Sequence, residues 1–142
     1  MIAVRERMPS DDPFIFKSWL RSCRKSLRGS RSPADVYFAE MHKEVEGILP
    51  YAKTLVATDV SDQDFLIGFI CTSKLEAVTS ILHFVYVKRE LRKYEVARCL
   101  AQKSGLDLAK PFFYTHETQL TGRLKRKFPL AIYKRDVLNI LG

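Results

Sequence analysis

The sequence lacks a long apolar run. No segment approaches the roughly 18 consecutive apolar residues that a membrane-spanning helix needs. The first ten residues, MIAVRERMPS, carry charges where a signal peptide requires an apolar stretch. Internal repeats and low-complexity segments are missing as well. We therefore expect a cytoplasmic protein with no membrane partner and no repeat architecture.

Metal-binding patterns are also missing. The three cysteines are far apart and form no Cys-x-x-Cys pair: Cys23, Cys71 and Cys99. The three histidines are scattered too, with no two at ligand spacing on one expected element: His42, His83 and His116. Because neither a zinc nor a redox signature is present, we predict reduced cysteines and no metal.

Hydrophobic residues make up 46% of the 142 residues, enough for the core of one domain. We predict a single domain over residues 1–142. The net charge of +8 and the pI of about 9.5 attract anions, such as nucleic acid, an anionic surface or a phosphate-bearing cofactor. One basic cluster stands out because it falls between an expected strand and an expected helix: Lys88, Arg89, Arg92 and Lys93.

Residues 80–87, SILHFVYV, predict a strand that is buried on both sides. Its side chains alternate between one face (Ile81, His83, Val85, Val87) and the other (Leu82, Phe84, Tyr86). Both faces are apolar, which is typical of a central strand. After the basic turn, a helix is predicted over residues 94–104, with Gly105 as its C-cap. The first N–H groups of a helix attract an anion, so this strand, turn and helix form a phosphate-binding arrangement.

Apolar periodicity and turn residues predict the remaining elements. They are a strand over 2–8, helices over 13–27 and 34–49, strands over 53–58 and 65–72, a strand over 112–115, a helix over 119–127 and a strand over 130–133. Residues 137–141 extend that strand or form a final turn. The strands at 53–58, 65–72 and 80–87 make an antiparallel meander.

The turn Arg92-Lys93-Tyr94-Glu95-Val96-Ala97 resembles a motif of the GNAT superfamily of N-acetyltransferases. That motif reads Arg or Gln, two residues, Gly, one residue, Gly or Ala, and Arg92 and Ala97 match its ends. It follows the fourth strand and opens the helix beneath the acetyl-CoA pyrophosphate. The order of elements also resembles the GNAT order over nearly the whole chain. Small proteins of this kind occur in many bacterial and phage genomes.

The resemblance implies a mixed α/β (α+β) fold with a mostly antiparallel central sheet flanked by helices. The fourth and fifth strands, residues 81–87 and 112–115, would run parallel and splay apart. The implied activity is that of an acyl-CoA-dependent N-acyltransferase, which moves acetyl from acetyl-CoA to an amine. The acceptor would enter from the side of the first two helices and the last strands, where mixed charges select no particular amine.

The same resemblance implies a cofactor site. Acetyl-CoA would enter the gap between the splayed strands, where backbone groups of Val85 and Val87 pair with the pantetheine arm. The pyrophosphate would be held by the motif: Arg92, Lys93, Tyr94, Glu95, Val96 and Ala97. Two features depart from the family. Glu95 replaces glycine and adds a Cβ and a negative charge. Residues 119–128 contain no tyrosine, although many relatives carry one there that protonates the departing thiolate; Tyr114 and Tyr133 lie on neighbouring strands.

The acceptor amine must lose a proton, directly or through water, and His83 is the candidate base. It lies on the central strand, near the place where some family members have a catalytic glutamate. The alternative is a buried histidine that is hydrogen-bonded into the sheet. Glu76 and Glu117 are weaker candidates because both lie near predicted turns.

Two other functions fit parts of the sequence. Glu95 and the missing tyrosine are compatible with a GNAT-like module that has lost its chemistry and only binds. The segment Ala101-Gln102-Lys103-Ser104-Gly105 has the spacing of a helix-turn-helix, which would make a basic nucleic-acid-binding protein. However, Pro111 and the predicted strand after it interrupt the second helix of that motif.

Overall fold

The computed structural model describes residues 2–24, 33–75, 79–116 and 126–134. Their elements are β1 (Ile2–Glu6), the 3₁₀ helix η1 (Pro9–Asp11), α1 (Asp12–Arg24), α3 (Ala34–Ile48), β2 (Lys53–Asp59), β3 (Asp62–Leu75), β4 (Thr79–Val87), the 3₁₀ helix η2 (Arg89–Tyr94), α4 (Val96–Ser104), β5 (Phe112–Tyr114) and β6 (Ala131–Tyr133).

The six strands lie in one sheet in the order in which they occur in the chain, β1 to β6. Neighbours from β1 to β4 are antiparallel, whereas β5 is parallel to both β4 and β6. β4 is therefore an interior strand, as its doubly apolar pattern predicts. The predicted mixed fold, with a mostly antiparallel sheet and parallel fourth and fifth strands, is confirmed.

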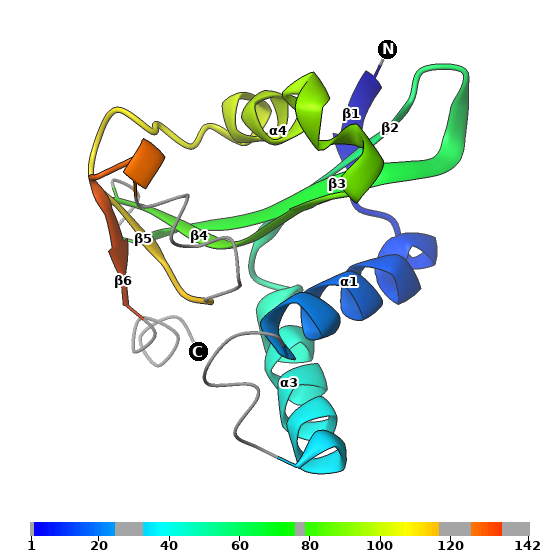
Figure 1. Ribbon diagram of the computed structural model, residues 1–142, viewed down its shortest axis with the longest axis vertical. Helices are drawn as coiled ribbons and strands as arrows, with labels where there is room; N and C mark the ends of the chain where they lie inside the picture. Colours follow the sequence, from blue (N-terminus) through cyan, green and yellow to red (C-terminus); the bar gives the residue numbers. More distant parts are fainter. Residues whose placement is uncertain (1, 25–32, 76–78, 117–125, 135–142) are drawn as a thin grey trace.

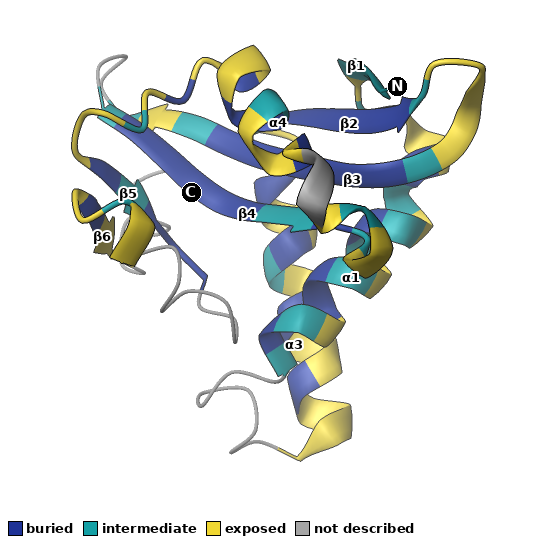
Figure 2. Ribbon diagram, turned by 45° about the horizontal axis from the view of Figure 1, so that its top comes forward, coloured by how far each residue is buried: buried dark blue, intermediate teal, exposed yellow. Residues whose placement is uncertain are grey.

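Helices cover both faces of the sheet (Figure 1): α4 lies on one face, and α1 and α3 lie on the other. Each face has its own cluster of buried apolar side chains. The α1–α3 side includes Trp19, Phe69 and Phe84, whereas the α4 side includes Leu82, Leu100 and Phe112. Figure 2 shows the central strands as largely buried, while the helices keep exposed outer sides.

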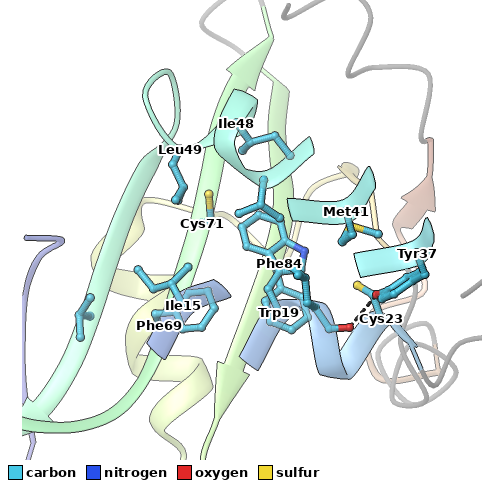
Figure 3. Packing of buried hydrophobic residues seen from close by; sticks show 13 residues of the cluster. Ile15, Trp19, Cys23, Tyr37, Met41, Ile48, Leu49, Phe69, Cys71 and Phe84 are labelled. Atoms are coloured by element: carbon cyan, nitrogen blue, oxygen red, sulfur yellow. Dashed lines mark hydrogen bonds between the residues drawn. The ribbon is translucent and has the colours of Figure 1, made fainter. Parts of the chain in front are cut away.

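The helices owe their places to apolar residues at four-residue spacing. α1 buries Ile15, Trp19 and Cys23, and such residues share one side of a helix. α3 buries Tyr37 and Met41 in the same way. The Tyr37 hydroxyl donates a 2.6 Å hydrogen bond to the carbonyl oxygen of Leu20 (Figure 3), which ties the two helices together.

A buried ion pair fixes the entry into α1. The Asp11 carboxylate accepts hydrogen bonds from Arg5 at 2.7 and 2.9 Å and from the Met8 N–H at 2.8 Å. Its side chain is 3% exposed. Burial opposes the charge on Asp11, but the bonds from Arg5 and Met8 outweigh it, and the pKa of Asp11 lies below its ordinary value.

Several boundaries differ from those predicted. β3 begins at Asp62, not at residue 65, because the Asp59 carboxylate accepts bonds from the N–H and hydroxyl of Ser61 and closes a short turn. α4 begins at Val96, not at residue 94, because the 3₁₀ helix η2 occupies the basic turn. Of the predicted helix over 119–127, residues 119–125 lie outside the described residues, as do 137–141.

Candidate functional site

The fourth and fifth strands diverge. Only Ile81 and Leu82 of β4 pair with β5 in the described residues, opposite Phe113 and Tyr114. One more bond runs from the Thr115 N–H to the Leu82 carbonyl oxygen at 3.2 Å. β4 then continues to Val87 while β5 ends at Tyr114. The open end of this pair is the splayed opening that the resemblance implies.

A β-bulge in β4 lies at the point of divergence. Cys71 of β3 pairs with Phe84, and the next residue, Thr72, pairs with Leu82, so His83 lies between two pairs. The bulge reverses the alternation of faces. Leu82 and Val87 therefore pack on the α4 side and Phe84 on the opposite side. The predicted grouping of Leu82 with Phe84 is wrong for this reason.

Beyond the bulge, β4 turns backbone groups toward the opening. The Lys88 N–H donates to the Ile67 carbonyl oxygen of β3 at 2.9 Å. Because backbone groups alternate between the two edges of a strand, those of Val85 and Val87 point away from β3. Gly68, opposite Val87, permits the close approach of the strands, since a Cβ there would collide with the Tyr86 carbonyl oxygen.

The basic turn is pinned against the end of β4. Arg92 donates from Nε to the carbonyl oxygen of Val87 at 2.9 Å, and its guanidinium carbon lies 5.8 Å from the centre of the Tyr86 ring. The Lys88 ammonium lies 4.7 Å from the ring centre of Phe65. Arg92 thus stands where the edge of β4 meets the turn, while Lys93 and Tyr94 complete η2.

The start of α4 faces the same turn. The first bond into the helix runs from the Cys99 N–H to the Glu95 carbonyl oxygen at 3.1 Å. The N–H groups of Val96, Ala97 and Arg98 precede it, and such groups attract an anion. The Glu95 carboxylate lies 3.8 Å from an Arg98 nitrogen, and both side chains are largely exposed.

Glu95 adopts a left-handed backbone conformation, with φ of 57° and ψ of 29°. It is the one non-glycine residue with positive φ among those described. Glycine tolerates this region without strain, which gives a physical reason for the family's preference at this position. The expectation that glycine here would weaken the helix is wrong, because Glu95 precedes α4 and does not lie within it.

We expect Glu95→Gly to raise the free energy of unfolding by about 1 kcal/mol. The substitution removes left-handed strain of about 1–2 kcal/mol, partly offset by the greater freedom of glycine in the unfolded chain. Denaturant titration measures the change. Glu95→Ala removes the same charge but keeps the Cβ, so it is the control. Equal gains in the two variants would assign the effect to charge and contradict backbone strain.

His83 belongs to a buried chain of hydrogen bonds. Its Nε2 lies 2.8 Å from the Ser73 hydroxyl, and its Nδ1 lies 3.1 Å from the Thr115 hydroxyl. Thr115 in turn lies 2.8 Å from Nδ1 of His116, whose Nε2 is 2.5 Å from the Glu44 carboxylate. His83, Thr115 and His116 are all buried.

Burial, together with the neighbouring His116, lowers the pKa of His83 to about 4. His83 is therefore neutral near pH 7 and has a partner at each ring nitrogen. Its role as the base stays a prediction. Glu76 and Glu117 lie outside the described residues. Sequence reasoning missed Glu44, Thr115 and His116, because residues so far apart in sequence share no local pattern.

Other expected features can be compared with the described residues. They contain no group of three or more potential metal ligands and no helix with the length and hydropathy of a membrane span. The segment after α4 leads into the strand β5, so the described chain has no second helix where a helix-turn-helix would place its recognition helix.

Comparisons with known proteins agree with this geometry at the level of fold. The chain has the fold of the GNAT superfamily of N-acetyltransferases, as its element order predicts. Among similar solved structures is the apo form of YjaB from Escherichia coli, with a TM-score of 0.51, 21% identity, and coverage of 73% of this chain and 64% of that one. An acetyltransferase of the GNAT family from Staphylococcus aureus Mu50 has a TM-score of 0.52 and 16% identity, with coverage of 73% and 63%.

A third structure, described as a possible acetyltransferase from Clostridium difficile 630, has a TM-score of 0.51 and 22% identity, with coverage of 72% and 68%. The matched region thus spans less than two thirds of the first two of these proteins. No family model matches the chain, and no curated protein matches it.

Proposed function

We propose that the protein is an N-acyltransferase that uses an acyl-CoA, with acetyl-CoA as donor and an amine as acceptor. One observation carries the proposal: the edge of β4 is open beyond Leu82 and leads directly to a basic turn and the start of α4. An extended pantetheine arm can pair with such an edge, as peptides do with exposed strands. The fold, shared with acetyltransferases, supports this assignment.

In the proposed complex, Val85 and Val87 pair with the arm through their backbone groups. Arg92 and the backbone N–H groups of residues 93–97 hold the diphosphate. The amine nitrogen attacks the thioester carbon, the C–N bond forms, the C–S bond breaks, and the thiolate leaves. One proton leaves the nitrogen. An N–H of Val85 or Val87 stabilises the developing oxyanion.

We expect Arg92→Ala to weaken acetyl-CoA binding by roughly 10- to 150-fold, the equivalent of one or two charge-assisted hydrogen bonds. Isothermal titration calorimetry measures the affinity. The control is Arg89→Ala, which removes the same charge from an exposed residue of the same turn. S-acetylpantetheine lacks the diphosphate, so its binding should not distinguish Arg92→Ala from the parent.

If the parent shows no binding at millimolar acetyl-CoA, and Glu95→Gly does not restore it, the acyltransferase proposal fails. Titration with short duplex DNA at two salt concentrations tests the nucleic-acid alternative, since phosphate-dominated binding weakens steeply with salt.

Glu95 favours a second candidate, a GNAT-like module that binds without catalysing. Its Cβ and carboxylate stand beside the proposed diphosphate site, where the family has glycine. This candidate predicts acetyl-CoA binding with no release of free thiol in the presence of a panel of amines. Release of thiol that depends on an added amine excludes it.

A further inference from the structure

The hydrogen-bond chain around His83 joins three elements and the segment after β5. Ser73 comes from β3, His83 from the bulge of β4, Thr115 and His116 directly follow β5, and Glu44 comes from α3. Its middle members are 0–5% exposed, whereas Ser73 and Glu44 at its two ends are partly exposed. The chain thus runs through the interior, past the divergence of β4 and β5, between two ends that solvent can reach.

The donors and acceptors of this chain permit two complete arrangements. With His116 neutral, its Nε2–H donates to Glu44, Thr115 donates to His116 Nδ1, His83 Nδ1–H donates to Thr115, and Ser73 donates to His83 Nε2. With His116 protonated, every bond except that to Glu44 reverses. His116 Nδ1–H then donates to Thr115, Thr115 donates to His83 Nδ1, and His83 Nε2–H donates to Ser73. All five groups keep their partners in both arrangements.

We propose that Ser73, His83, Thr115, His116 and Glu44 form a proton relay, which carries the proton of the acceptor amine from Ser73 to His116. The proposal rests on the function proposed above and assigns His83 the role of a carrier rather than that of the base. The chain lies on the α1–α3 side of the sheet, the side from which the resemblance implies that the acceptor enters.

The transfer balances as one proton in and one proton stored. The amine, directly or through a water, gives a proton to the Ser73 oxygen, and Ser73 passes its own to His83 Nε2. His83 passes its Nδ1 proton to Thr115, and Thr115 passes its proton to His116 Nδ1. His116 becomes an imidazolium whose Nε2–H still faces the Glu44 carboxylate, so the charge is paired where it comes to rest.

The surroundings of the two histidines distinguish the store from the carrier. His83 has two neutral hydroxyls as partners and is buried, which disfavours a charge on it. His116 has a carboxylate at 2.5 Å. The other recorded neighbours of His116 are Thr115 and, from α1, the Trp19 ring edge-on at 5.2 Å. Among the described residues, Glu44 and His83 are the titratable groups that face it.

The first test needs no turnover. Nitrogen-15 NMR of the imidazole rings reports the tautomer of each histidine across a pH titration. We expect His83 to change from the Nδ1–H to the Nε2–H tautomer as His116 gains a proton. Thr115→Val, which replaces the hydroxyl with a methyl group, should uncouple the two rings, and Thr115→Ser should keep the coupling. A His83 that holds one tautomer while His116 titrates overturns the relay.

The second test uses turnover with acetyl-CoA and an accepted amine. Glu44→Gln preserves an acceptor for His116 Nε2–H but removes the negative charge, so kcat should fall roughly 100-fold. Glu46→Gln is the matched control, because Glu46 pairs with His42 at 2.8 Å on the exposed side of the same helix. Its kcat should equal that of the parent.

The outcomes separate the two proposals. A coupled tautomer change with the loss of kcat in Glu44→Gln supports the relay. A parent-like kcat in Glu44→Gln overturns it even if acyl transfer is confirmed. If the tautomers change together but no amine is acylated, the proposed function fails, while the two-arrangement chain remains supported.

Discussion

Replacing Trp19 with alanine is expected to lower the free energy of unfolding by about 3–5 kcal/mol. Trp19 is fully buried and lies at the centre of the cluster between α1, α3 and the sheet (Figure 3). Its ring stacks on Phe84 at 5.1 Å with an angle of 10° between the planes, and meets Phe69 at 6.4 Å. An alanine would leave a cavity that these rigid rings cannot fill.

Trp19→Phe separates volume from polarity. The indole Nε1 has no hydrogen-bond partner among the described residues. The phenylalanine variant therefore loses no recorded hydrogen bond and should cost only about 1–2 kcal/mol. Urea titration followed by circular dichroism gives both values. A loss in Trp19→Phe as large as that in Trp19→Ala would show that Nε1 matters and that the cavity does not dominate.

Asp11→Ala is expected to cost about 3 kcal/mol, because it leaves the Arg5 guanidinium partly buried without its carboxylate. It also removes the acceptor of the Met8 N–H. The matched control is Asp12→Ala. Asp12 pairs with Arg7 at 2.6 Å, but both side chains are about a quarter to a third exposed. Water screens such pairs, so the control should cost no more than about 1 kcal/mol. Similar losses in the two variants would contradict this account.

The contribution of Asp11 should also depend on pH. Its pKa is lower in the folded protein than in the unfolded chain. The stabilisation is therefore complete above the unfolded value of about 3.9, and it is lost as the pH falls through the folded pKa. Denaturant titrations at neutral and acidic pH should show the difference between parent and Asp11→Ala shrinking only in the acidic range.

The sequence was informative where a pattern is local. The doubly apolar run in residues 80–87 placed β4 inside the sheet, and the turn after it placed the start of α4 within two residues. The opening between β4 and β5 followed from the family's element order, not from any residue pattern in these short strands. Apolar periodicity, which averages over several residues, is suited to this level of detail.

Three features of the candidate site were beyond that reach. The bulge at His83 inserts one residue into a regular alternation, and alternation alone cannot show where the phase reverses. The left-handed conformation of Glu95 runs against the preference of its own residue type. The pairing of Glu44 with His116 exists only after α3 and the end of β5 have come together.

The strand order of the sheet has a consequence for how the protein is made. Because each strand lies beside the one that precedes it in the chain, no strand must wait for a later segment to fill a place between it and its neighbour. β1 to β4, with α1 and α3, can pair as they leave the ribosome, before β5 has been synthesised. The growing edge of the sheet is then β4, and β5 completes only its first residues. The opening proposed to receive acetyl-CoA is thus the part of that edge that β5 leaves uncovered.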